Sequence, residues 1–190
     1  MHATRRFLVA LGAAGAMAGA AAQTRDPVPV QQNQSIVTAE APRTPSVAAN
    51  QSTEDIDFLL EAVRTDLAEV QMGELARQRA GDPAVREFGR KLAADHLHAL
   101  QELEQILQPL DVTIPSEPTA EAQSHYAALS GLSGAEFDAA FLHMMIASHE
   151  EAIEEYGAQT HANPNKQLAD FATRALPMLR DHLATAESLR

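Results

Sequence analysis

Three histidines, His96, His149 and His182, have the side chains and positions best suited to chemistry. Each falls at or beside a core-facing position in the apolar stripe of a different predicted helix. Apolar stripes usually exclude a group that can become charged near neutral pH. Three imidazoles that face one interior therefore need partners, either hydrogen-bonding groups or a metal ion.

Glu69 is the carboxylate expected nearest to these imidazoles. Counted back from the first predicted interhelical turn, it lies at nearly the height of His96, and Asp66 lies one turn earlier. Three imidazoles and one carboxylate are a plausible ligand set for zinc, copper or non-haem iron. The sequence thus predicts a metal site, without specifying the metal, from His96, His149, His182 and Glu69.

The heights of the last two histidines argue against a tight cluster of four ligands. If the last two helices fold back around Ala162, His149 and His182 differ in height by roughly 9 Å at 1.5 Å per residue. His143 would then be closer to the height of His182. A looser site, or one with two ligands, remains open.

The competing hypothesis is a group of core histidines that bind no metal. A buried histidine can stay neutral while it hydrogen-bonds a carboxylate. Asp95 and Asp181 directly precede His96 and His182 and are candidates for that role.

Other candidate residues favour no specific chemistry. Met144 and Met145 suit soft copper ligation, but adjacent methionines on a packed helix more often fill a core. His98, His125 and His161 are expected in solvent. The sequence contains no glycine-rich phosphate loop, nucleophile elbow or Ser/His/Asp arrangement.

Four long helices are predicted to position the histidines. Asp82-Pro83 is expected to open the second helix and Asn163-Pro164 the fourth, because Asp or Asn caps free amides and proline suits the first helical turn. Ser52 with Asp55 predicts a capping box at the start of the first helix. The predicted helices cover residues 52–81, 83–110, 133–161 and 164–189.

The connection between the second and third helices is unusually long. It covers residues 111–133, with a short helix expected around 120–129. A hairpin needs only a few residues, so this length predicts a crossover along the bundle. The expected fold class is all-α: a ferritin-like four-helix bundle, two antiparallel hairpins joined by a long crossover, in a domain of residues 52–190.

The first 51 residues have a different composition. Residues 1–22 combine Arg5 and Arg6, an apolar run and small residues, which predicts a signal peptide for export by the Sec or the twin-arginine route. Residues 23–51 contain four prolines among Gln, Ser and Thr without helical periodicity, which predicts a disordered linker. The expected location is periplasmic or exported, with outer-membrane association left open.

Composition excludes several classes of function. The formal net charge is −12, which disfavours a groove for nucleic-acid phosphates. The chain has no cysteine, so disulfides, thiol catalysis and thiolate metal sites are excluded.

Four segments, 69–76, 88–96, 137–150 and 176–183, resemble the exported bacterial family catalogued as domain of unknown function 4142. The resemblance covers about residues 55–189. It implies a ferritin-like four-helix bundle, in a family often labelled as periplasmic or outer-membrane proteins, and no established activity. Ferritin-like di-iron sites use Glu-x-x-His on two helices. Here Ala93 and Leu179 stand three residues before His96 and His182, so that dinuclear ligand set is absent.

Three hypotheses of function follow. The first is a non-catalytic periplasmic bundle that binds a metal ion through the inward histidines. The second is a structural or interaction module of the cell envelope, with a protein partner and no metal. The third is a redox enzyme with a degenerate iron site. The sequence does not identify a substrate or an oligomeric state.

Overall fold

The computed structural model describes residues 52–161 and 163–190. The predicted signal peptide (1–22) and disordered linker (23–51) lie outside the described residues. In the described ranges, no helix is both long and apolar enough to cross a membrane.

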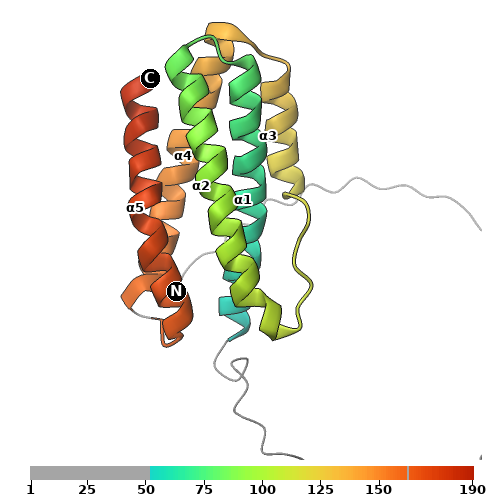
Figure 1. Ribbon diagram of the computed structural model, residues 1–190, viewed down its shortest axis with the longest axis vertical. Coiled ribbons are helices and arrows are strands. Elements are labelled where there is room, and N and C mark those ends of the chain that lie inside the picture. The colour runs from blue at the N-terminus through green and yellow to red at the C-terminus, as the bar shows by residue number, and fades with distance from the viewer. Residues whose placement is uncertain (1–51, 162) are drawn as a thin grey trace, which may run out of the picture. The chain divides into compact units, whose positions relative to one another are not determined.

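The described chain is all-α, as predicted. Its α1–α2 pair and its α4–α5 pair each pack as an antiparallel hairpin (Figure 1). The stretch between α2 and α4, which includes α3, runs back along the bundle beside α1, so the predicted crossover is confirmed. The elements are α1 Thr53–Arg79, α2 Pro83–Leu107, the 3-10 turn η2 Gln108–Leu110, α3 Ala120–Ser130, α4 Gly134–His161 and α5 Lys166–Leu189.

The starts of α1 and α2 follow the predicted capping chemistry, whereas the start of α5 differs. Ser52 and Asp55 form a reciprocal capping box at α1, and Asp82 caps α2 with Pro83 in its first turn. The predicted N-cap of α5, Asn163, is wrong by two residues. The side chain of Asn165 accepts hydrogen bonds from the first backbone amides of α5, so Asn165 is the N-cap.

The first hairpin depends on two glycines that let α1 and α2 approach closely. A Cβ atom added to Gly73 would lie 2.5 Å from the carbonyl oxygen of Gly89, and one added to Gly89 would lie 2.6 Å from the Cβ of Ala76. Neither neighbour can yield easily, because one is backbone and the other is a Cβ. The separation of the two helices is therefore set by glycine at both positions.

Asp138 of α4 fastens the second hairpin to the turn between α1 and α2. Its two carboxylate oxygens accept hydrogen bonds from the backbone nitrogens of Gly81 and Asp82, both at 2.9 Å. This contact fixes the height of α4 against the first hairpin at one end of the bundle.

Asp55 of α1 makes the corresponding contact at the opposite end. Its carboxylate accepts hydrogen bonds from the side-chain amides of Asn163 at 2.7 Å and Asn165 at 3.3 Å, in the turn between α4 and α5. Burial raises the pKa of Asp55, but these bonds and those from Ser52 outweigh it and hold the pKa below its ordinary value. The two hairpins are thus held in one axial register.

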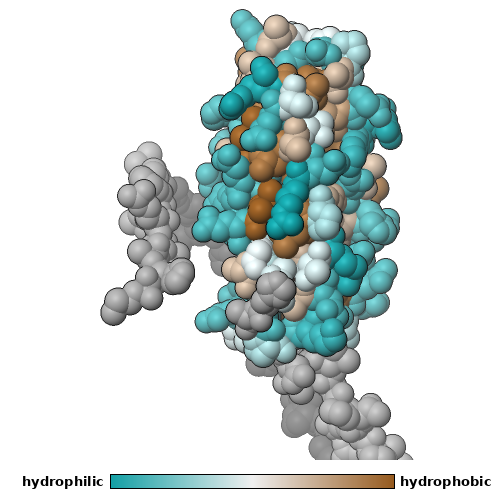
Figure 2. Space-filling model, turned by 90° about the vertical axis from the view of Figure 1, so that its left-hand side faces the viewer, coloured by the Kyte–Doolittle hydropathy of each residue, from teal (hydrophilic) through white to brown (hydrophobic). Residues whose placement is uncertain are grey.

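Buried polar residues divide the apolar core in two. One apolar cluster, with Phe88, Phe137 and Phe141, lies toward the α1–α2 turn, and the other, with Leu59 and Phe171, lies toward the α4–α5 turn. The face seen in Figure 2 is largely hydrophilic, with a narrow apolar strip along it. We call the buried group between the clusters the polar layer; it consists of Asp66, Glu69, His96, His149 and His182.

Replacing Gly89 with alanine tests the close contact of α1 and α2. Gly89→Ala should lower the free energy of unfolding by about 1–3 kcal/mol, because the added methyl group forces the two helices apart. Urea unfolding of the metal-free protein, followed by circular dichroism, measures the change.

Gly157→Ala in α4 is the matched control. Nothing lies within 4 Å of a Cβ at that position, so the gain in helix propensity should raise stability by up to about 1 kcal/mol. Equal effects of the two substitutions would contradict a role for Gly89 in helix approach.

Candidate metal centre

Three imidazoles from three helices meet at the middle of the bundle. His96 comes from α2, His149 from α4 and His182 from α5, and they expose 2%, 2% and 0% of their surface. One ring nitrogen of each lies within 4.8 Å of one nitrogen of both others. The ring centroids are 5.8, 5.3 and 5.2 Å apart in the pairs His96–His149, His96–His182 and His149–His182. The three rings therefore surround one point.

Each ring directs its other nitrogen outward to an oxygen that accepts hydrogen bonds. A carboxylate or a carbonyl oxygen can only accept, so the outward nitrogen of each ring carries the proton. In a neutral ring this leaves the lone pair on the inward nitrogen. The outward contacts are His96 Nδ1 to Asp66 Oδ1 at 2.7 Å, His149 Nδ1 to the Met145 carbonyl at 2.9 Å, and His182 Nε2 to Asp95 Oδ2 at 2.9 Å.

The inward nitrogens of two rings are in direct proximity. His149 Nε2 lies 3.2 Å from His182 Nδ1. With both protons outward, two lone pairs face each other, which is unfavourable unless a cation lies next to both. Ligand nitrogens of a tetrahedral zinc ion are about 3.3 Å apart, given bond lengths near 2.0–2.1 Å. The observed separation fits two ligands of one ion.

Burial keeps these two rings neutral, which is the form that binds metals. Burial, together with the neighbouring rings of His96 and His182, lowers the pKa of His149 to about 3. Burial also lowers the pKa of His182 to about 4, against the opposing effect of its bond to Asp95. Both rings are therefore uncharged at neutral pH, so no proton competes with a cation for their inward nitrogens.

His96 completes the group with an inward nitrogen that has no partner. Its Nε2 is buried and makes no hydrogen bond. The Oδ2 atom of Asp66 is also buried and also makes none. Burial lowers the pKa of His96, but the hydrogen bond and the charge of Asp66 outweigh this and raise it; burial also raises the pKa of Asp66. Asp66 thus holds the His96 ring through the proton on Nδ1. Carboxylate–histidine pairs of this kind orient metal-binding imidazoles in known sites.

A family model for a domain of unknown function, DUF4142, matches residues 40–189. The chain belongs to the DUF4142 family. No curated protein and no solved structure matches it. The family assignment agrees with the resemblance seen in the sequence, whereas kinship with ferritins stays a prediction.

In this DUF4142 protein, the expected difference in height does not separate the rings of His149 and His182, which are in contact. His143, the residue expected closer to the height of His182, is exposed. His149 lies 12 residues before the end of α4 at His161, and His182 lies 16 residues after the start of α5 at Lys166, a difference of about 6 Å at 1.5 Å per residue. Side chains lean toward the N-terminus of their own helix, and these directions oppose each other in antiparallel neighbours. The two rings lean toward each other and so close the gap.

The carboxylate partners differ from those expected from sequence neighbours. Asp95 precedes His96 but bonds to His182, and Asp181 is exposed, 3.1 Å from the ammonium of Lys91. Sequence reasoning did not assign Asp66 as the partner of His96. The available signal was its position: Asp66 continues the buried stripe of α1 three residues after Val63.

Glu69 is buried at the edge of the histidine group rather than among its three nitrogens. The cluster with mutual distances within 4.8 Å consists of the three histidines. Glu69 Oε1 accepts a hydrogen bond from Ser148 Oγ at 3.0 Å, and its Oε2 has no partner. Its role as a fourth ligand stays a prediction.

Proposed function

We propose that this protein is exported to the periplasm and there binds one transition-metal cation at the centre of its bundle. The observation that carries the metal proposal is the arrangement of the three imidazoles. Every outward nitrogen is held by an acceptor, and the inward nitrogens of His96, His149 and His182 converge. The proposal is a binding function and includes no reaction.

The donor set favours a transition metal such as zinc, copper or iron over the alkaline-earth cations. Neutral imidazole suits zinc, copper, nickel and iron, whereas carboxylate-rich sites suit magnesium, calcium and manganese. Three imidazoles leave a fourth position for water or for a carboxylate oxygen, as in open zinc sites. Asp66 Oδ2 and Glu69 Oε2 are the nearby buried oxygens without a partner.

The proposal of export rests on the amino-terminal sequence. Arg5 and Arg6 precede an apolar run that ends in small residues, the pattern of a cleaved export signal. Osmotic shock of expressing cells should release a chain that begins near residue 23. A full-length chain confined to the cytoplasm would contradict export.

Metal titration of chelator-washed protein tests the binding proposal. By calorimetry, wild type should bind one zinc or copper(II) ion per chain, and the bound ion should raise the unfolding temperature. Single replacements of His96, His149 or His182 by glutamine should each weaken binding by about 100-fold or more, since loss of a mere outer-sphere partner already costs about 10–100-fold.

His98→Gln is the matched control, because His98 lies two residues after His96 on the same helix with its side chain 75% exposed. It should bind as wild type does. Absence of binding by the wild type, or equal binding after all three buried histidines are replaced, would overturn the proposal. That result would favour the alternative of an envelope interaction module without a metal.

A further inference from the structure

The proposed metal site is closed to solvent, so a cation has to cross the wall of the bundle. The three histidine side chains are almost completely buried. Two pockets approach the polar layer from opposite sides, one between α2 and α5 and one enclosed by α1, α3 and α4. The inference below rests on the proposed metal-binding function.

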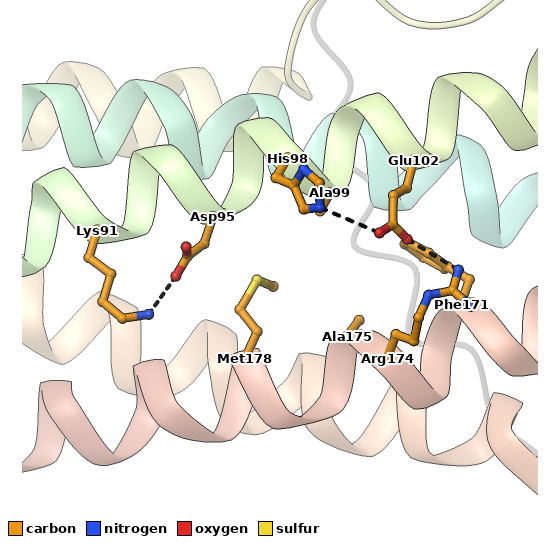
Figure 3. A pocket seen from close by; sticks show the side chains of 9 residues that line it. All are labelled: Lys91, Asp95, His98, Ala99, Glu102, Phe171, Arg174, Ala175 and Met178. Atoms are coloured by element: carbon orange, nitrogen blue, oxygen red, sulfur yellow. Dashed lines mark hydrogen bonds and ion pairs between the residues drawn. The ribbon is translucent and has the colours of Figure 1, made fainter.

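In the pocket between α2 and α5, of about 350 Å³, both carboxylates are paired with cationic side chains. Asp95, which holds His182, also forms an ion pair with Lys91 at one end of the pocket (Figure 3). At the other end, Glu102 is paired with both His98 and Arg174 (Figure 3). The ammonium of Lys91 places a positive charge beside Asp95, the carboxylate of this pocket that bonds to a site histidine, and this charge repels an incoming cation.

The pocket enclosed by α1, α3 and α4, of about 120 Å³, is lined by a residue whose buried carboxylate oxygen has no partner. Glu69 lines this pocket, exposes 4% of its surface, and its Oε2 makes no hydrogen bond. Soft and borderline metal donors line the pocket around it, namely Met72, Met144, Met145 and His125. Arg64 lines this pocket too, but it is paired with Glu61 at 3.1 Å and not with Glu69.

Glu69 also connects this pocket to the histidines. Its Oε1 accepts a hydrogen bond from Ser148 Oγ. The same Ser148 Oγ lies 3.3 Å from His149 Nδ1. Glu69 follows Asp66 by one turn of α1, and its carboxylate interacts electrostatically with both Asp66 and His96. One side chain therefore borders the pocket and the candidate metal centre.

We infer that a borderline transition-metal cation reaches the histidines through the α1–α3–α4 pocket, and that Glu69 Oε2 is the transfer ligand that passes it on. The thioethers of the lining are weak donors for such a cation, and a path needs contacts that attract an ion without retaining it. Burial raises the pKa of Glu69, whereas a cation beside Oε2 favours the charged carboxylate. In that form Glu69 supplies negative charge where the cation leaves water. Its neutral replacement should therefore slow association more than it weakens equilibrium binding.

Stopped-flow mixing with Co²⁺ tests this path, because the visible absorbance of tetrahedral cobalt reports arrival at the histidines. Glu69→Gln should slow association roughly tenfold or more, since local charge changes association rates by about 10- to 1000-fold. Its dissociation should slow as well, so that the equilibrium affinity changes by only a few-fold.

Ala122→Leu, which fills the same pocket from α3, should slow association without removing any charge. Ala99→Leu is the matched control in the α2–α5 pocket, and Ala127→Leu is an exposed control on α3. Both controls should bind at the wild-type rate.

Three results would overturn the inference while leaving the metal site intact. They are unchanged association in both Glu69→Gln and Ala122→Leu, slowing by Ala99→Leu alone, or loss of equilibrium binding in Glu69→Gln, which would make Glu69 a resident ligand. If wild type binds no cobalt, zinc or copper at equilibrium, the proposed function itself fails.

Discussion

The structure depends on how a layer of ionisable side chains is accommodated inside an apolar bundle. Burying a polar group without a partner costs about 1–3 kcal/mol, and an uncompensated charge costs more. Most atoms of the polar layer avoid this cost, because the outward ring nitrogens meet Asp66, Met145 and Asp95. The remaining inward atoms have no protein partner that satisfies them. A cation at the point they surround would convert this unfavourable arrangement into coordination bonds.

The rest of the fold positions that layer. Glycines 73 and 89 bring α1 against α2, and α1 carries Asp66 while α2 carries its partner His96. Asp138 and Asp55 hold the two hairpins at one relative height, which places the rings of α4 and α5 beside the ring of α2. The apolar clusters above and below the layer exclude water from it, so its electrostatic interactions are strong. The long crossover adds α3, which forms the outer wall of the pocket that contains Glu69.

The sequence was sufficient for the parts of the fold that depend on local chemistry. Capping residues and apolar periodicity predicted four long helices, and the length of residues 111–133 predicted the crossover. The apolar stripes of three helices each contain a histidine, and these stripes predicted that His96, His149 and His182 face the interior. The heights of His149 and His182 were predicted less well, because they depend on where α4 ends and α5 begins and on the direction in which each side chain leans. The partners of the rings could not be found from sequence neighbours, because Asp66 and Asp95 reach them from adjacent helices.

Zinc K-edge X-ray absorption of the zinc-reconstituted protein tests the central claim most directly. We expect three nitrogen scatterers at about 2.0–2.1 Å, together with the outer-sphere signal of imidazole rings. A coordination sphere of oxygen alone, without that imidazole signal, would contradict the account, because the three inward nitrogens would then not share an ion.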